Sequence, residues 1–193
     1  ANALDADATK ISIDINYNNS EFSSFKIIDN GVGIDEIRYQ RFSNLMDAQD
    51  TSHKGQGRLV YLHYFDNINF ESIYRKEQQL EKIIFNFNYN FDDSIYQKEN
   101  IFSEETGTCV SFSEFSKDRL GSKESINSTR IKENILSEFL PAFHKMKEAG
   151  KNIKISINTN IDNNFSNEVI SIDSIPEFEC LEIESDYLKN ISP

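Results

Sequence analysis

Apolar and polar residues alternate strictly in several stretches of this chain, and the alternation limits the folds it can adopt. In KISIDINY, from Lys10 to Tyr17, isoleucine or tyrosine stands at every second position. In residues 85–91, phenylalanine and tyrosine alternate with asparagine. Neighbouring side chains of a β-strand point to opposite faces, so a period of two predicts half-buried strands, antiparallel in the aromatic stretch.

Further strands and helices are expected between and after these stretches. FKIIDNG ends a second strand, residues 68–115 are mostly strand, and a later strand is centred on Ile155. Asp35 is a suitable N-cap for a helix that follows it. GRLVYLHYF, residues 57–65, fits a short helix or a buried segment.

The clearest helical pattern lies in the second half of the chain. Seven apolar residues from Ile131 to Met146 fall on one face of a helix. Gly150 is expected to cap its C-terminus, and Pro141 is expected to bend or split it. The sequence has no internal repeat and no linker rich in proline or glycine. Residues 1–193 are therefore interpreted as a single α+β domain.

Charge and composition argue against some partners. The formal net charge of −12 argues against direct nucleic-acid binding by this domain, because phosphate backbones are bound by lysine and arginine. No stretch is apolar and long enough to cross a membrane. Cys109 is expected to be a buried, reduced thiol far from Cys180, which favours a cytoplasmic location. The three histidines form no metal-ligand pattern with the cysteines.

The first of four short motifs is D-x-G-x-G at Asp29, Gly31 and Gly33, directly after a predicted strand. Asn-Gly between hydrophobic runs is also the strongest short-range signal for a hairpin turn. The motif alone therefore leaves a turn and a ligand site open.

The other three motifs are equally ambiguous when each is taken alone. G-x-G at Gly55 and Gly57 is common in turns, Gly107-Thr108 could leave a hairpin turn, and NALDA at residues 2–6 fits any alanine-rich helix. Their order is more informative. An asparagine on a helix is followed by a strand, D-x-G-x-G, a polar loop, G-x-G, and a Gly-Thr pair that opens a strand.

This order resembles the motif series of the GHKL ATPases, a superfamily that includes gyrase, the heat-shock chaperones of the ninety-kilodalton class, histidine kinases and MutL. NALDADAT is most similar to the MutL form of the first motif, and TGTCVSF to the gyrase and chaperone form of the last. The resemblance covers residues 1–115. It implies a Bergerat-type fold, which is a two-layer α+β sandwich with a mixed, mostly antiparallel sheet and helices on one face. It also implies ATP and Mg²⁺ as ligands.

The resemblance implies an adenine site at Asp29, Gly31, Gly33 and Thr108, and the chemistry of these residues agrees. An ionised carboxylate only accepts hydrogen bonds, as the adenine amino group requires. Glycine lets the backbone approach a flat purine without a Cβ in between. The Thr108 hydroxyl can donate and accept, which suits the ring nitrogens, directly or through water.

Phosphate groups are expected at the second glycine motif. Gly55 and Gly57 would expose backbone N–H groups at the start of a helix, a favourable place for an anion. Contacts from Lys54, Gln56 and Arg58 are expected from their position alone, because G-Q-G-R-L matches neither the MutL nor the chaperone form of this motif. The loop carries more basic than acidic residues, which suits a polyanion.

The resemblance also implies that Asn2 is a ligand of Mg²⁺. Magnesium keeps several waters and phosphate oxygens, so one protein oxygen is enough. The general base of the family is a glutamate four residues before this asparagine, upstream of Ala1, so no catalytic residue is expected in this chain. Asp5 is expected to support the site.

Three functions remain open. The first is a nucleotide-binding switch domain of an ATPase, in which closure of residues 36–58 over the ligand is coupled to further domains of the same chain. The second is a histidine-kinase catalytic domain, whose first two boxes would normally read N-A-x-K-[YF] and G-x-G-L-G. The third is an interaction module that has the fold but no ATP turnover. The chain is interpreted as a fragment that is monomeric, with an ATP-dependent homodimer possible at full length.

Overall fold

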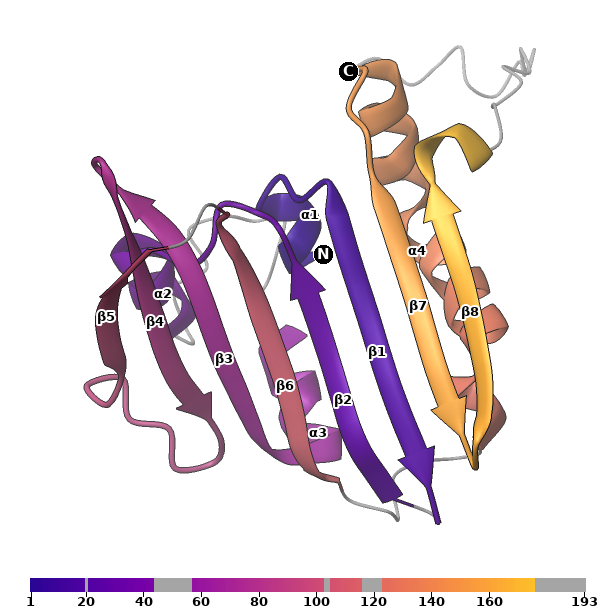
Figure 1. Ribbon diagram of the computed structural model, residues 1–193, viewed down its shortest axis with the longest axis horizontal. Helices are drawn as coiled ribbons and strands as arrows, with labels where there is room; N and C mark the ends of the chain where they lie inside the picture. Colours follow the sequence, from indigo (N-terminus) through magenta and orange to yellow (C-terminus); the bar gives the residue numbers. More distant parts are fainter. Residues whose placement is uncertain (20, 44–56, 103–104, 116–122, 176–193) are drawn as a thin grey trace, which may run out of the picture.

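The computed structural model of this chain is built on one eight-stranded sheet (Figure 1). It describes residues 1–19, 21–43, 57–102, 105–115 and 123–175. The strand order is β5-β4-β3-β6-β2-β1-β7-β8. The pair β1–β7 is parallel and the other neighbouring pairs are antiparallel. The strands are β1 (Lys10–Asn18), β2 (Glu21–Asp29), β3 (Phe65–Lys76), β4 (Gln79–Phe87), β5 (Gln97–Ile101), β6 (Gly107–Phe115), β7 (Lys154–Ile161) and β8 (Asn164–Ser171).

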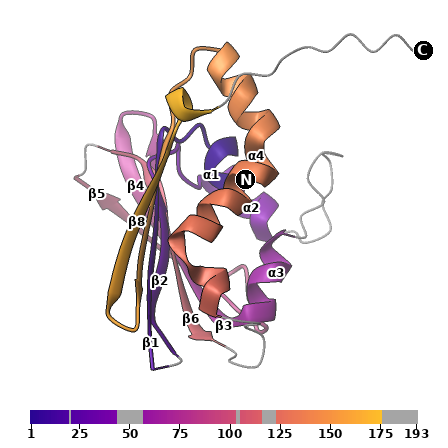
Figure 2. The same ribbon diagram turned by 90° about the vertical axis from the view of Figure 1, so that its right-hand side faces the viewer.

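The α-helices pack on one face of this sheet, which Figure 2 shows edge-on. A mixed, mostly antiparallel sheet with helices on one face is the α+β fold class expected from the sequence. No helix of the described ranges is long and apolar enough to cross a membrane. The helices are α1 (Asn2–Asp5), α2 (Glu36–Ser43), α3 (Gly57–Tyr64) and α4 (Ser128–Glu148), with short 3₁₀ turns η2 (Lys123–Ile126) and η3 (Ile172–Ser174).

Aromatic side chains fill the layer between α2 and the sheet. Phe70 and Phe85, on the paired strands β3 and β4, stack with their ring centroids 4.8 Å apart. Phe42 of α2 packs on both rings, at 5.0 and 5.2 Å. The buried Tyr39 of α2 donates from its hydroxyl to the Asp93 carbonyl oxygen at 3.0 Å. These contacts hold α2 against β3 and β4.

The long helix α4 covers the other half of the sheet. Phe143 is fully buried and belongs to a cluster with isoleucines of β1, β7 and β8. The helix runs without interruption through Pro141, so the expected split is wrong. The packed apolar face offsets the hydrogen bond that proline removes. Ala149 is the C-cap, and Gly150 follows it with φ of +65°.

The strand expected over residues 85–91 ends early. β4 stops at Phe87, and Asn88 Oδ1 accepts the Asn90 backbone N–H at 2.8 Å, which turns the chain. Tyr89 is exposed, and its hydroxyl donates to the Leu62 carbonyl oxygen at 2.7 Å. A local hydrogen bond of asparagine therefore overrides the alternation of the sequence.

Two expectations about single residues have different outcomes. Asp35 caps α2 as expected, because its Oδ1 accepts the Arg38 backbone N–H at 2.8 Å. Cys109 is half-buried on the helix-free face of β6 rather than in the core. Its neighbours Thr108 and Val110 take the positions that face the helices. Cys180 lies outside the described residues.

Candidate functional site

One polar row crosses three neighbouring strands on the helix-covered face. Asp29 ends β2 and pairs with Thr108 of β6, which in turn pairs with Ser72 of β3. Thr108 is 9% exposed and Ser72 is fully buried. The hydroxyl oxygens of Thr108 and Ser72 are 2.8 Å apart. The row thus joins residues of two motifs that are far apart in the sequence.

Asp29 is a partly buried carboxylate at the open end of this row. Its Oδ1 accepts the Gly31 backbone N–H at 2.8 Å. Burial raises the pKa of the Asp29 carboxyl above its ordinary value, while the backbone N–H groups of Gly31 and Thr108 oppose the rise. A partly desolvated carboxylate makes strong hydrogen bonds with a ligand that donates.

Ser72 belongs to no sequence motif and was not expected at the site. Its hydroxyl oxygen lies 2.8 Å from the Ile34 backbone nitrogen and 3.1 Å from the Gly107 carbonyl oxygen. The sequence does hold a signal, since Phe70 and Tyr74, two positions away on either side, are buried aromatic residues. A polar residue in such an apolar series must find hydrogen-bond partners.

Gly31 and Gly33 let the motif loop pack tightly against the rest of the protein. A Cβ on Gly31 would lie 2.7 Å from the Ala6 carbonyl oxygen, and a Cβ on Gly33 would lie 2.2 Å from the Ile73 carbonyl oxygen. The Val32 backbone N–H donates to the Ala6 carbonyl oxygen at 3.0 Å. The packing of the motif loop therefore requires glycine at both positions. This requirement is separate from the expected approach of the backbone to a purine.

Asn30, inside the first motif, has a role that was not expected. Its Oδ1 accepts the backbone N–H groups of Thr9 and Lys10 at 2.9 and 2.8 Å, and its Nδ2 donates to the Thr9 hydroxyl at 2.9 Å. These bonds tie the loop to the first residues of β1. The chain goes on from this loop to α2, so the hairpin interpretation of the motif is wrong.

Helix α1 carries Asn2 and Asp5 beside the same loop. Ala6, which accepts the Val32 N–H, directly follows this helix, and Figure 1 shows α1 at the ends of β1 and β2. The side chains of Asn2 and Asp5 are both exposed. Across the described ranges, no three His, Cys, Asp or Glu side chains gather as a metal site. A metal ion at α1 would need ligands from outside the protein, as Mg²⁺ normally has.

Only the end of the second glycine motif lies within the described residues. Gly57 is the first residue of α3 and Arg58 the second, and the Arg58 side chain lies outside the description. Lys54, Gly55 and Gln56 lie outside it entirely. Since α3 leads into β3 at the lower end of the sheet in Figure 1, its N-terminus points towards the end where α1 lies.

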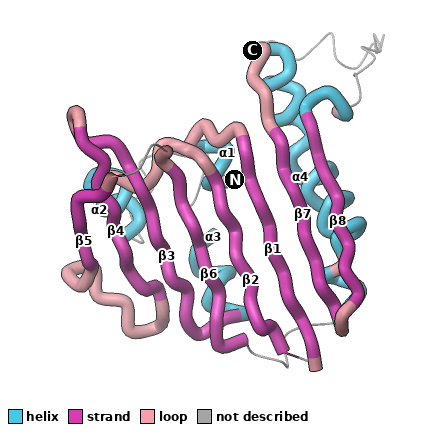
Figure 3. The backbone as a smooth tube through the Cα atoms, in the orientation of Figure 1, coloured by secondary structure: helices cyan, strands magenta, loops and turns pink. Residues whose placement is uncertain are grey.

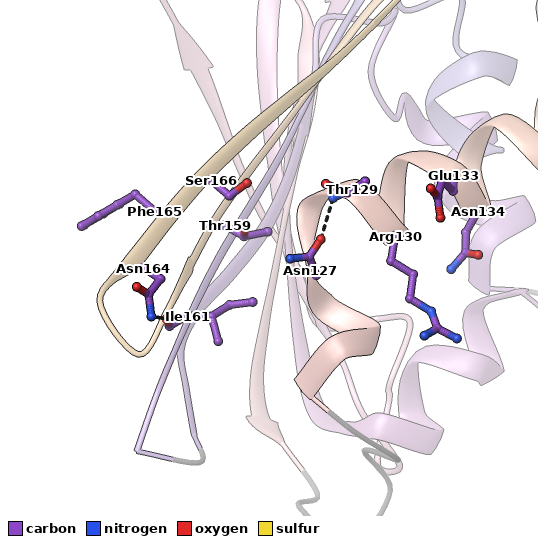
Figure 4. A pocket seen from close by; sticks show the side chains of 10 residues that line it. All are labelled: Asn127, Thr129, Arg130, Glu133, Asn134, Thr159, Ile161, Asn164, Phe165 and Ser166. Atoms are coloured by element: carbon purple, nitrogen blue, oxygen red, sulfur yellow. Dashed lines mark hydrogen bonds between the residues drawn. The ribbon is translucent and has the colours of Figure 1, made fainter.

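Two cavities can be compared with the polar row. One, of about 720 Å³, opens between the start of α4 and the β7–β8 hairpin (Figure 4). Asn127 there already caps the helix, and the Thr159 hydroxyl in its wall is shielded from solvent. A second, of about 360 Å³, borders Asp29. Neither cavity is lined by Thr108 or Ser72, so neither coincides with the polar row as a whole.

Comparisons with solved structures find partial matches at low identity. The crystal structure of the N-terminal domain of a DNA repair protein shares 16% identity, with a TM-score of 0.47, and the match covers 88% of this chain and 50% of that one. The 43K ATPase domain of Thermus thermophilus gyrase B, in complex with an aminocoumarin, shares 17% identity, with a TM-score of 0.45, over 87% of this chain and 42% of that one. The chain thus spans about half the length of these structures or less.

A comparison with curated protein sequences finds no significant match. A family model, described as histidine kinase-, DNA gyrase B- and HSP90-like ATPase, matches residues 1–122. The matched residues exceed half of the chain and contain α1, the first motif and the whole polar row. The chain therefore belongs to the family of histidine kinase-, DNA gyrase B- and HSP90-like ATPases.

Proposed function

We propose that this chain is the nucleotide-binding domain of a GHKL-type ATPase, and that it binds ATP or ADP with Mg²⁺ at the polar row and the loop beside it. The observation that carries the proposal is the row itself. Asp29, Thr108 and Ser72 come from three strands and meet on the helix-covered face, in a chain of this ATPase family.

Adenine binds at the open end of the row. One oxygen of the Asp29 carboxylate is engaged by the Gly31 backbone N–H, and the other accepts from the amino group of adenine. The Thr108 hydroxyl lies beside it and reaches the ring nitrogens directly or through water. Gly31 and Gly33 keep the motif loop close to its neighbours, because a Cβ at either position would clash with Ala6 or Ile73.

The phosphates bind at the start of α3. Gly57 opens this helix, and unpaired backbone N–H groups at a helix N-terminus attract anions. We also propose that the phosphates contact four residues around this helix start, which are Lys54, Gly55, Gln56 and Arg58.

Mg²⁺ is held by Asn2 together with phosphate oxygens and water. The side chain of Asn2 is exposed on α1, beside the motif loop. A single amide oxygen is enough for an ion that keeps most of its shell as water and phosphate. Bound magnesium neutralises phosphate charge. Asp5, one turn further along α1, supports the site.

Closure over the nucleotide, expected for residues 36–58, is proposed for the part of this segment that follows α2, with α2 (Glu36–Ser43) as its fixed base. Glu36, at the start of α2, forms ion pairs with Lys98 of β5 and with Lys76 of β3, the latter at 3.1 Å. Tyr39 is buried against the sheet. Ion pairs and ring contacts hold α2 in place, so the proposal assigns no movement to this helix.

ATP hydrolysis, coupling to further domains and ATP-dependent dimerisation are proposed for the whole protein. These proposals rest on membership of the family. They are made for the whole protein and not for this chain alone, because the chain spans about half the length of the solved structures it matches, or less.

The test is calorimetric titration of the chain with ADP and with a non-hydrolysable ATP analogue, each with and without Mg²⁺. We expect binding that Mg²⁺ strengthens and that Asp29→Asn abolishes, because an amide in place of the carboxylate loses the charge that receives the amino group. Circular dichroism must show that the variant is folded.

Asp14→Asn is the matched control. Asp14 is also a half-buried, hydrogen-bonded carboxylate, which accepts from Ser12 Oγ at 3.0 Å and from Asn158 Nδ2 at 2.5 Å. It lies on the helix-free face of β1, so its variant should bind nucleotide as the wild type does. Equal affinity of Asp29→Asn and wild type would refute the assignment of the adenine site, and no binding by the wild type would refute the proposed function.

A further inference from the structure

The larger cavity, of about 720 Å³, opens at the start of α4 and is separate from the polar row (Figure 4). Its lining residues all lie between positions 127 and 166, whereas the family match ends at residue 122. Membership of the family therefore does not say what this cavity holds. Its volume is within the range of sites for small molecules.

One wall of the cavity carries a polar group without a partner. Thr159 of β7 is 3% exposed, and its hydroxyl oxygen is shielded from solvent and forms no hydrogen bond within the part of the chain that the structure describes. The helix-facing positions before it, Ile155 and Ile157, belong to the core. In Figure 4 the Thr159 side chain is directed from β7 towards the start of α4. A buried hydroxyl without a partner is unfavourable, and a molecule inside the cavity can supply that partner.

The start of α4 offers the cavity hydrogen-bond donors and positive charge. Asn127 Oδ1 accepts the Thr129 backbone N–H at 2.9 Å, so the Asn127 Nδ2 atom, which is turned towards β7 in Figure 4, remains to donate. Arg130, in the first turn, lines the cavity and forms no ion pair with any described residue. The N-terminus of a helix adds a positive partial charge. These groups together favour a carboxylate.

Glu133 adds a negative charge to the same lining. Residues three apart on a helix can form an ion pair, but the side chains of Arg130 and Glu133 point apart in Figure 4, and no ion pair joins them. One guanidinium and one carboxylate leave the lining without net charge. A doubly charged phosphate group would meet a single cation and would be repelled by Glu133. A molecule with one carboxylate and one ammonium group matches both side chains.

The lining offers no aromatic surface to a flat ligand. Phe165 borders the cavity, but in Figure 4 its ring is directed away from α4. Stacking of a nucleobase on a ring of this lining is thereby excluded. The ligand is instead held by hydrogen bonds and by the two separated charges.

We propose that this cavity binds a free α-amino acid with a polar side chain. The ligand carboxylate binds Arg130 and Asn127 Nδ2, its ammonium group binds the Glu133 carboxylate, and its side chain forms a hydrogen bond with the Thr159 hydroxyl. A residue inside a peptide chain has neither charge, so the site selects the free amino acid. The inference does not rest on the proposed nucleotide site.

The first experiment measures the Tm of the chain by circular dichroism with each of the standard L-amino acids in excess. At least one amino acid with a polar side chain should raise the Tm, because a ligand that binds only the folded state stabilises it. The methyl ester and the N-acetyl derivative of the same amino acid each lack one charge and should leave the Tm unchanged. No rise with any polar amino acid, or an equal rise with either derivative, would overturn the inference.

Thr159→Val tests the role of the buried hydroxyl by calorimetric titration with the amino acid that raises the Tm most. Valine keeps the shape of the side chain and removes the unpaired hydroxyl, so the Tm of the free variant should equal or exceed that of the wild type. Its affinity for the amino acid should nevertheless fall about five-fold, the effect of one neutral hydrogen bond. Equal affinities of Thr159→Val and wild type would overturn the inference.

Arg130→Gln tests the carboxylate contact at an exposed position, where the substitution leaves the core intact. The affinity for the amino acid should fall about ten-fold or more, since a hydrogen bond to a charged group is lost. Lys145→Gln is the matched control, because it removes one positive charge from the same helix at an exposed position outside the cavity. Equal affinities of Arg130→Gln and Lys145→Gln would also overturn the inference.

Discussion

Gly33→Ala should destabilise the protein by a mechanism that the structure lets us work out. Gly33 has φ of +77°, and a Cβ there would lie 2.2 Å from the Ile73 carbonyl oxygen and 3.1 Å from the Tyr74 Cβ. Both neighbours belong to the central strand β3 and cannot rotate away. The loop must therefore retreat from β3 by about 1 Å to reach a normal carbon–oxygen contact.

This retreat removes a hydrogen bond as well. The Ile34 N–H, next to Gly33, donates to Ser72 Oγ at 2.8 Å, and a further ~1 Å takes that pair beyond hydrogen-bond distance. An alanine at left-handed φ costs about 1–2 kcal/mol. The lost bond to a buried hydroxyl costs about 1–3 kcal/mol. The free energy of unfolding should thus fall by about 2–5 kcal/mol, which lowers Tm by about 4–20 °C.

Gly150→Ala supplies the matched control. Gly150 has a similar φ, +65°, but a Cβ there meets nothing within 4 Å. The free energy of unfolding should therefore fall only by the cost of an alanine at left-handed φ, about 1–2 kcal/mol. Thermal unfolding followed by circular dichroism should rank the wild type above Gly150→Ala and Gly150→Ala above Gly33→Ala. Equal Tm values for the two variants would refute the argument from the contact with Ile73.

Three further results are expected. Phe143→Ala empties a fully buried ring position under α4 and should lower the free energy of unfolding by about 3–5 kcal/mol in urea titrations, and a loss below about 1 kcal/mol would contradict this packing. Burial and the Glu81 carboxylate raise the pKa of Tyr74 from 10.0 to about 12, so its contribution to stability is complete below pH 10 and is lost as the pH rises towards 12. Tyr74→Phe should lack this loss, and parallel Tm curves for both proteins across that range would contradict it. Asn30→Ala leaves two backbone N–H groups of the β1 start without their acceptor and should lower the free energy of unfolding by about 1–3 kcal/mol in urea, whereas an unchanged midpoint would show that water replaces the amide.

The elements that the sequence predicted well are those set by local pattern. β1 has the strict alternation of KISIDINY, and α4 has one apolar face with seven members. Asp35 caps α2 by a bond to the backbone only three residues away. Alternation, helical period and capping all act within one or two turns of chain, so a single sequence contains them.

The features that the sequence did not predict depend on partners far along the chain. Ser72 meets Thr108 and Ile34, and Asn30 meets Thr9 and Lys10. These contacts follow from the order and register of the strands, which no local pattern contains. The end of β4 at Phe87 was missed for the opposite reason, because a short-range bond at Asn88 competes with the alternation.

The parallel pairing of β1 with β7 has a consequence for synthesis of the protein. β1 leaves the ribosome before its parallel partner β7, which starts at Lys154. At about 5–20 residues per second, the delay is on the order of ten seconds. Throughout that time the nascent chain presents an open strand edge bordered by isoleucines, Ile11 and Ile15 among them. Chaperones that bind exposed strand edges can therefore act on β1 only until β7 pairs with it.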